Sequence, residues 1–410
     1  MTFSGESLRY DLRDPAIRSN PYPVFARLRL EDPVHWSPAL SGWLLTRYDD
    51  VRRAHVAPEM GSDRITPFYN KLPATQQAVL ADVVRYLNLW LVFRSPPEHS
   101  RLRKLLGAGF AMPVIQGLEP RIRQIVDSLA DQLDEQLQSN GQADVIASFA
   151  MMVPAMVILD MIGAPQSMLP SLKAWSDDML LFIGSAQGVP DKYERARSGA
   201  QNMSAYFREL IAQRRVQPCD DMISRLIAAR DSDEALSEDE LVASCMLMLF
   251  GGHETTTNLI GNAVHALIMH PEQRAKLIAR PELIGSTVEE VLRFDGPSNS
   301  SARIVVTDHE LGGKRLEAGQ RVFAMINAAN RDASQFDRAE SFDIERTPNR
   351  HLTFGQGIHF CMGASLARLE GRIAIDTLIR RFPTLGLIDS DPPEWTSTMI
   401  MRGLRRLPVS

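Results

Sequence analysis

Apolar residues recur at intervals of three and four through most of the chain, the spacing expected for one buried face of an α-helix. The clearest run ends at Asn140-Gly141, where glycine suits the left-handed conformation that closes many helices. Its apolar members are Ile122, Ile125, Val126, Leu129, Leu133 and Leu137. The pattern predicts a helix that ends near residue 140.

A second helix is predicted in the middle of the chain. Ser237 and Glu240 have the spacing of a capping box, and the helical pattern continues to about His270, just before Pro271. Thirty-odd residues at about 1.5 Å each would span roughly 45 Å, the width of a whole domain. Because Leu241–Phe250 is apolar on most faces, we expect this helix to run through the core.

Strand signals are few and short. They lie at Val34–Trp36, Trp43–Thr46, Ile304–Val306 and Arg321–Ala324, with turns at Ser41-Gly42 and Gly312-Gly313. The pattern as a whole predicts a mainly α protein with small antiparallel β-sheets, formed by residues 1–410 as a single domain.

Composition excludes several classes of function. The net charge of −5 gives no basic excess for nucleic acid, and no stretch of 18 apolar residues suggests a membrane span. Met1–Tyr10 lacks the apolar region of a signal peptide. The three cysteines, Cys219, Cys245 and Cys361, are odd in number and far apart, which suits the reducing cytoplasm rather than a disulfide framework.

The segment around Cys361 carries the most informative chemistry. Gly355 and Gly357 let the backbone approach something bulky. Cys361 should lie where a helix begins, since apolar residues follow it at helical spacing, and a helix N-terminus favours the metal-binding thiolate. Two other readings of the residues are an inert buried cysteine and a zinc site with His351 and His359. The zinc reading lacks a Cys-x-x-Cys pair and a fourth ligand nearby.

The pattern Phe354-Gly355-x-Gly-x-His359-x-Cys361-x-Gly363 resembles the haem-binding loop of the cytochromes P-450 at every fixed position. The resemblance implies a cytochrome P-450 fold, a single domain shaped like a triangular prism. It also implies that Cys361 binds the iron of haem b, where a thiolate pushes electron density onto iron and favours O–O cleavage. Phe354, Gly355, His359 and Gly363 would contact the cofactor.

The long central helix contains Gly251-Gly252, followed by His253, Glu254 and three threonines beginning at Thr255. Each glycine costs a helix about 1 kcal/mol, so a function should offset them. The Thr255 hydroxyl can bond to the Gly251 carbonyl and open a groove beside Glu254; close helix packing and a surface threonine run is the alternative.

This segment resembles the oxygen-activation motif of the same family, Ala/Gly-Gly-x-Asp/Glu-Thr. The resemblance implies that Thr255 orders the hydrogen bonds around bound O2 and that Glu254 relays protons from solvent. His253 has no implied task and is expected to be structural.

Glu290 and Arg293 lie three apart on a predicted helix, a spacing that is common by chance. They resemble the Glu-x-x-Arg pair of the family, whose third partner would be Arg346. The resemblance implies a buried charge triad that holds the haem loop in place.

Cationic residues are also expected for the two haem propionates. His99 and Arg103 resemble the His-x-x-x-Arg of the family, and Arg303 and His359 match its other propionate contacts; the alternative for each is a solvated surface cation. The family usually has an acidic residue where Ser95 stands, a departure that affects little beyond local capping.

The resemblance implies a monooxygenase that uses O2 and NAD(P)H-derived electrons to insert one oxygen atom by hydroxylation or epoxidation. We expect no fused reductase domain, a monomer, and an external ferredoxin with its reductase. A basic docking face would be formed by Arg101, Arg103, Lys104 and Arg350.

The substrate is expected to be a small molecule, a secondary-metabolite intermediate. Pocket residues are expected from Gly61–Phe93, Leu247–Gly251, Ser298–Ser301 and Ser397–Met401, in particular Leu247, Gly251, Ser298, Asn299 and Ile400. The polar run after Pro297 indicates a fairly large substrate with oxygen functions, such as a polyketide, terpenoid or peptide-derived metabolite, unless it only serves a turn.

Three other functions share some of these residues. A peroxide-driven haem-thiolate enzyme would use Cys361 but would not need Glu254 and Thr255. A haem-based gas or redox sensor would form no product. An oxidase that desaturates or couples carbons would use the same residues.

Overall fold

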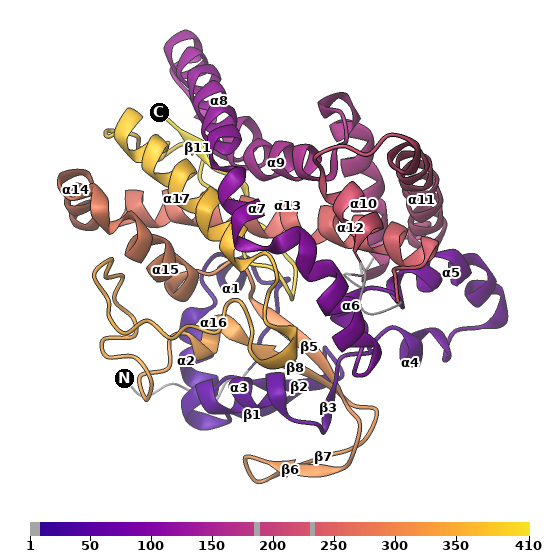
Figure 1. Ribbon diagram of the computed structural model, residues 1–410. Helices are drawn as coiled ribbons and strands as arrows, with labels where there is room; N and C mark the ends of the chain where they lie inside the picture. Colours follow the sequence, from indigo (N-terminus) through magenta and orange to yellow (C-terminus); the bar gives the residue numbers. More distant parts are fainter. Residues whose placement is uncertain (1–8, 184–188, 230–233) are drawn as a thin grey trace.

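The computed structural model describes residues 9–183, 189–229 and 234–410. Helices make up most of it, and strands gather in one five-stranded sheet and three two-stranded sheets (Figure 1). The helices are α1 (Pro15–Ser19), α2 (Tyr22–Glu31), α3 (Tyr48–Val56), α4 (Thr66–Tyr69), α5 (Ala74–Leu87), α6 (Glu98–Leu106), α7 (Met112–Gly117), α8 (Glu119–Asn140), α9 (Met152–Ile162), α10 (Leu169–Ile183), α11 (Lys192–Val216), α12 (Met222–Ala228), α13 (Glu238–Met269), α14 (Pro271–Ala279), α15 (Ile284–Phe294), α16 (Ile326–Ala329) and α17 (Ala364–Arg381).

Shorter helical turns and strands complete the elements. The turns are η1 (Leu91–Phe93), η2 (Gly107–Phe110), η3 (Ile146–Ala150, a π-helix), η4 (Gln166–Met168), η5 (Pro281–Leu283) and η6 (Gly357–His359). The strands are β1 (Val34–Ser37), β2 (Gly42–Leu45), β3 (Met60–Gly61), β4 (Ala143–Asp144), β5 (Ser300–Val305), β6 (His309–Leu311), β7 (Lys314–Leu316), β8 (Arg321–Met325), β9 (Glu394–Trp395), β10 (Leu404–Arg406) and β11 (Pro408–Val409).

The two helices predicted from periodicity are confirmed. Helix α8 ends at Gly141, which has φ of 69° and donates its N–H to the Leu137 carbonyl at 2.9 Å. Helix α13 begins with the predicted capping box, in which Ser237 and Glu240 each accept a hydrogen bond from the other's backbone N–H. Most of its side chains are buried against α9, α11 and α17, and Figure 1 shows it crossing the helical part of the molecule.

The main sheet contains the predicted antiparallel pairing of β5 with β8, together with one parallel pair. Its order is β1-β2-β8-β5-β3, and β2 pairs with β8 in parallel, with Trp43 opposite Val322. Parallel neighbours need a long crossover, and here the crossover is almost the whole helical part of the chain. The other pairs in this sheet are antiparallel, and Gly312-Gly313 turns the separate β6–β7 hairpin.

The cysteine segment forms a loop that leads into α17. This helix begins at Ala364, so the prediction that Cys361 opens the helix was wrong by almost one turn. Among the described residues, no helix is both long and apolar enough to cross a membrane.

Candidate active site

The loop that carries Cys361 is closed by backbone hydrogen bonds. The Cys361 N–H donates to the Phe354 carbonyl at 2.9 Å, which fixes the two ends of the turn. Gly355 and Gly357 both have φ of 69°, a conformation that other residues rarely adopt. A Cβ on Gly357 would lie 2.9 Å from Val56, so glycine there also allows the loop to pack against α3.

Cys361 lines an internal cavity of about 430 Å³. Its side chain is open to this cavity, while the protein encloses it on the other sides. Burial raises the pKa of the thiol, although the Gly363 amide and the charges of Arg103 and Arg368 oppose that shift. The sequence predicted a lowered pKa from a helix N-terminus, but the helix starts three residues later and burial dominates.

The cavity joins segments that are far apart in the sequence. On one side it is lined by the Cys361 loop, and on another by α13 through Gly251 and Thr255. Much of the remaining lining is apolar. It includes Trp90, Leu91, Val92, Phe93, Leu106, Phe110, Ile158, Ile183, Met248 and Phe250.

Three of the four predicted cationic residues, Arg103, Arg303 and His359, line this cavity, and His99 packs behind His359. The ring centroids of His99 and His359 are 4.4 Å apart, and both ring nitrogens of His99 are buried without a hydrogen-bond partner. Arg103 and Arg303 line the cavity, and burial lowers the pKa of Arg303 to about 10. Neither arginine forms an ion pair with any described acidic residue, so neither is a solvated or paired surface cation.

Two further polar residues, His55 and Arg64, line the same cavity. His55 Nε2 lies 2.8 Å from the Ser301 hydroxyl, while its Nδ1 is buried without a partner. Burial and the neighbouring charges of Arg303 and His359 lower the pKa of His55 to about 3. The sequence analysis missed His55, whose segment shows no recognisable spacing, whereas Arg64 lies in the predicted pocket segment Gly61–Phe93 but was not singled out.

The cluster fits a cofactor that carries carboxylates. Its guanidinium and imidazole groups supply hydrogen-bond donors in a region where buried donors and charges need partners. His359 contacts the Ser62 hydroxyl at 2.9 Å, and burial together with the charges of His99, Arg303 and Arg103 lowers its pKa to about 3. The two propionates of a haem would accept hydrogen bonds from His99, Arg103 and Arg303.

Thr255 makes the hydrogen bond to Gly251 that the sequence analysis predicted. Its hydroxyl donates to the Gly251 carbonyl at 2.8 Å, while the helical assignment of α13 continues unbroken through the two glycines. Space is open beside Gly251, where an added Cβ would meet no atom within 4 Å. Gly251 and Thr255 therefore border the cavity as a small, polar notch.

Glu254 and His253 point away from the lining of the cavity. Burial raises the pKa of the Glu254 carboxyl, nearby Asp177 adds to this shift and Lys173 opposes it; Oε2 has no hydrogen-bond partner. Lys173 and Asp177 pair with each other on α10 at 2.6 Å and are partly exposed. Burial also lowers the pKa of His253 to about 4. Glu254 thus lies between the notch and a charged pair that reaches solvent.

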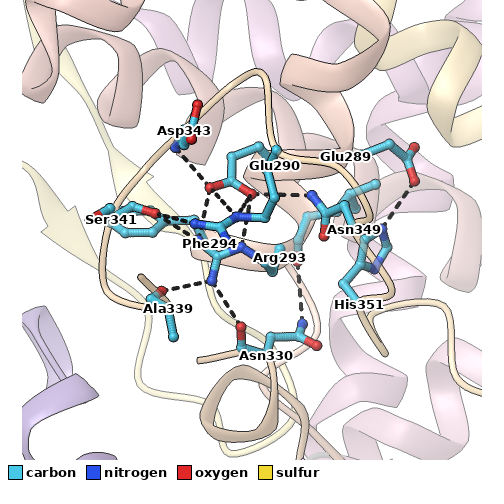
Figure 2. Close-up of polar contacts among 12 residues, drawn as sticks. Glu289, Glu290, Arg293, Phe294, Asn330, Ala339, Ser341, Asp343, Asn349 and His351 are labelled. Atoms are coloured by element: carbon cyan, nitrogen blue, oxygen red, sulfur yellow. Dashed lines mark hydrogen bonds and ion pairs between the residues drawn. The ribbon is translucent and has the colours of Figure 1, made fainter. Parts of the chain in front are cut away.

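The structure brings the three residues of the predicted charge triad together. Arg293 Nε and Nη2 each lie 2.8 Å from a different oxygen of Glu290, and both side chains are fully buried. Arg346 Nε approaches Glu290 Oε2 at 3.1 Å. Glu290 also accepts from the Asp343 N–H and from Asn349 (Figure 2).

Arg293 has a partner for each of its five N–H groups. Besides the two bonds to Glu290, it donates to the carbonyls of Asn330, Ala339 and Ser341 at 3.0, 2.8 and 2.8 Å (Figure 2). The triad therefore fixes the long segment that leads from α16 to the Cys361 loop.

A second acidic residue of α15 holds the Cys361 loop from the other side. Glu289 accepts from Arg368 Nε at 2.6 Å and lies 3.2 Å from His351 Nε2 (Figure 2). His351 and His359 thus have other partners, and no group of three or more potential metal ligands occurs among the described residues.

Four of the five named pocket residues line the cavity: Leu247, Gly251, Ser298 and Ile400. Asn299 does not, and its prediction was wrong. Its amide donates to the Tyr10 hydroxyl and to the Met399 carbonyl, away from the cavity. These two hydrogen bonds hold the Asn299 side chain away from the cavity.

The other serines of this run have local partners. The Ser300 hydroxyl donates to the Met399 carbonyl at 2.8 Å, and that of Ser301 contacts His55. Ser298 alone of the three keeps a hydroxyl without a described partner. The polar run is therefore weaker support for a polar substrate than the sequence suggested.

The proposed docking face changes in the structure. Arg101 pairs with Glu240, and Arg103 faces the cavity, so neither offers a free surface charge. Arg350 is exposed and has no acidic partner among the described residues. Arg101 is not available for docking because it lies on the face of α6 beside the start of α13, where Glu240 balances its charge.

Comparison with known proteins identifies the family to which this chain belongs. The model of the cytochrome P450 family matches residues 70–280 and 276–406 of the chain. The chain belongs to the cytochrome P450 family. Vitamin D(3) 25-hydroxylase of Pseudonocardia autotrophica is 39% identical over 407 residues, covering 98% of this chain and 96% of that protein. The 6-deoxyerythronolide B hydroxylase of Saccharopolyspora erythraea is 33% identical, covering 97% and 98%.

Solved cytochrome P450 structures share the whole fold. The crystal structure of P450BioI with hexadec-9Z-enoic acid ligated acyl carrier protein has a TM-score of 0.87 and 35% identity, covering 97% of this chain and 99% of that one. The predicted fold and class of enzyme are thus confirmed: the chain is a cytochrome P450 monooxygenase of the bacterial type.

Proposed function

We propose that this cytochrome P450 inserts one atom of O2 into a secondary-metabolite intermediate, by hydroxylation or epoxidation, with haem b as its cofactor and electrons from a separate ferredoxin and its NAD(P)H-dependent reductase. The observation that carries the proposal is the placement of Cys361 and Thr255 on one cavity. Relatives of similar coverage include the cytochrome P450 monooxygenase PikC of Streptomyces venezuelae and mycinamicin IV hydroxylase/epoxidase of Micromonospora griseorubida.

The Cys361 loop would hold the cofactor. Bound haem supplies O2 activation, and a thiolate ligand favours O–O cleavage. Arg103, Arg303 and His359 line the cavity and would bind its two propionates. His99 would join them, because it packs against His359 and its ring nitrogens have no partner among the described residues. Phe354, Gly355 and Gly363 would surround it as part of the loop.

Protons would reach the cavity through α13. Burial raises the pKa of Glu254, which makes its carboxyl a weaker acid than an exposed one and suits it to carry a proton towards the cavity. Rotation of its side chain would exchange protons with the Lys173–Asp177 side. Thr255 would then position the donated proton at the edge of the notch.

The electron carrier would dock on the Cys361 side. Arg350, just before the loop, and Arg372 on α17 are exposed cations without an acidic partner among the described residues, and Ile358 in the loop is 48% exposed. A small basic surface with an apolar centre suits a weakly bound acidic carrier that must leave again. We expect the protein to act as a cytoplasmic monomer.

Isotope transfer tests the reaction. The purified protein, with a ferredoxin, its reductase and NADPH, is given candidate substrates under ¹⁸O2. One labelled oxygen in each product, with the other in water, is expected. Product that takes its oxygen from water would contradict a monooxygenase. No product with any competent donor pair would favour a sensor.

Charge reversal tests the docking surface. Arg350→Glu and Arg372→Glu should slow reduction by ferredoxin and make it less dependent on ionic strength. Arg280→Glu, far from the Cys361 loop in the sequence and paired with Glu345, serves as the control. Reduction rates that stay the same in all three variants would refute this surface.

A further inference from the structure

Arg64 is a buried cation whose task is not explained by the fold. It follows β3, and its guanidinium lies 4.7 Å from the centroid of the Phe93 ring, on the lining of the cavity. It forms no ion pair with any described acidic residue. Its neighbour Asp63 uses its carboxylate to accept the backbone N–H groups of Ile65 and Thr66, at 3.1 and 3.0 Å.

The charges that line the cavity do not balance. Arg64, Arg103 and Arg303 carry three positive charges, and the two carboxylates of the cofactor would offset two of them. Glu370 is the one acidic residue on the described lining, and burial raises its pKa to about 8, so it is mostly neutral at pH 7. One positive charge is left over, and a buried unpaired charge is costly.

An aromatic wall lies beside Arg64. The ring of Trp90 lines the cavity, while its indole N–H is buried and turned away from it. Trp90 stacks on Phe93, with ring centroids 6.0 Å apart and planes within 4°. Arg64 and Trp90 therefore contact the same aromatic ring, and Arg64 is the donor on this part of the lining.

The aromatic rings extend from Arg64 to the notch formed by Gly251 and Thr255. Trp90 also contacts Phe250, with ring centroids 5.2 Å apart, and Phe250 directly precedes Gly251 on α13. A ligand bound to Arg64 by a polar end would lay its apolar body along this wall and bring a distant carbon to the notch beside Thr255.

We propose that Arg64 forms a subsite for the carboxylate of the substrate. The substrate is then an apolar monocarboxylic acid, oxidised at a carbon far from its acid group. This inference rests on the proposed monooxygenase function and names the class of substrate for the same site.

Matched ligands and variants test the subsite. Dissociation constants of a long-chain fatty acid and of the primary alcohol of the same length are measured on the haem-loaded protein by the shift of the Soret band. We expect the wild type to bind the acid about ten-fold or more tightly than the alcohol, since a charge-assisted bond is lost with the alcohol. Arg64→Gln should abolish this preference, Arg64→Lys should keep part of it, and the exposed control Arg405→Gln should keep all of it.

Two results would overturn the subsite. The first is a wild type that binds acid and alcohol equally. The second is an Arg64→Gln variant that keeps the preference but loses haem faster to apomyoglobin, which would assign Arg64 to the cofactor carboxylates. Failure of the proposed function looks different, because the wild type would then lack the spectrum of a haem thiolate, while tryptophan fluorescence with the same two ligands would still report the preference.

Discussion

Replacing Arg293 with methionine removes the centre of the buried charge triad. Both Arg293 and Glu290 have fully buried side chains, and all five N–H groups of Arg293 are bonded. Methionine fills a similar volume but donates no hydrogen bond. Glu290 then keeps only Arg346 as a charged partner, and the carbonyls of Asn330, Ala339 and Ser341 lose theirs.

The cost can be worked from these contacts. Breaking a buried ion pair by removing one partner costs about 3–5 kcal/mol. The stranded carbonyls add to this, although water that enters the site would compensate in part. Since a domain is stable by about 5–15 kcal/mol, we expect the free energy of unfolding to fall by about a fifth or more. Arg293→Lys keeps the charge but supplies fewer donors in the wrong geometry, so its loss should be intermediate.

The assay is denaturant unfolding followed by circular dichroism, with haem retention measured in parallel. The midpoint for Arg293→Met should move to lower denaturant while the slope stays the same. Arg280→Ala, which removes the exposed pair with Glu345, should leave the midpoint unchanged. A loss for Arg293→Met below about 1 kcal/mol, the range of exposed pairs, would refute the reasoning.

Three further outcomes are expected. Thr255→Ala should keep the haem spectrum but lower product formation by about 10²-fold, with electrons appearing as hydrogen peroxide; unchanged product from added peroxide would favour the peroxide-driven reading. Gly357→Ala should cost about 1–2 kcal/mol for the φ of 69° and reduce haem retention, whereas Gly107→Ala, where an added Cβ meets nothing within 4 Å, should not. Burial opposes the charge of Glu289, but its bonds to His351 and Arg368 lower its pKa from 4.5 to about 2. Its contribution to stability is therefore complete above about pH 4.5 and is lost as the pH falls towards 2, so acid should destabilise the wild type more steeply than Glu289→Gln, and equal pH profiles would contradict this.

Local patterns predicted the long helices well because each carries its own start, period and stop. The capping box at Ser237 acts within a few residues of the start of its helix, and the glycine at position 141 acts at the end of its helix. The parallel pairing of β2 with β8 was not predictable in this way. It depends on how nearly the whole chain between the two strands folds, and no local pattern records that.

The same distinction holds within the site. The Cys361 loop and the α13 notch were found because their residues are adjacent in the sequence. His55 was missed, and Arg64 was not singled out within its predicted pocket segment, because only the fold shows which side chains reach the cavity. Pairing of β3 with β5, with Gly61 opposite Ile304, carries the segment after β3 towards Arg303. Such residues become visible only once the sheet is known.

A local pattern also led to a wrong prediction for the pKa of the Cys361 thiol, which was expected to be lowered. Helix N-termini favour thiolates, but the benefit falls off within one turn and α17 begins only at Ala364. Burial raises the pKa instead. We infer that binding to iron, rather than the helix, must favour the thiolate in the loaded enzyme.

The central claim is that the Cys361 sulfur binds haem iron, and the absorption spectrum of the reduced protein under carbon monoxide tests it most directly. The wild type, expressed with ample haem, should show the strongly red-shifted Soret band of a thiolate ligand, and Cys361→Ala should lose it. Cys219, which is also exposed, offers a matched control, since Cys219→Ala should keep the band. A wild type without the band, or a Cys361→Ala variant that retains it, would contradict the account.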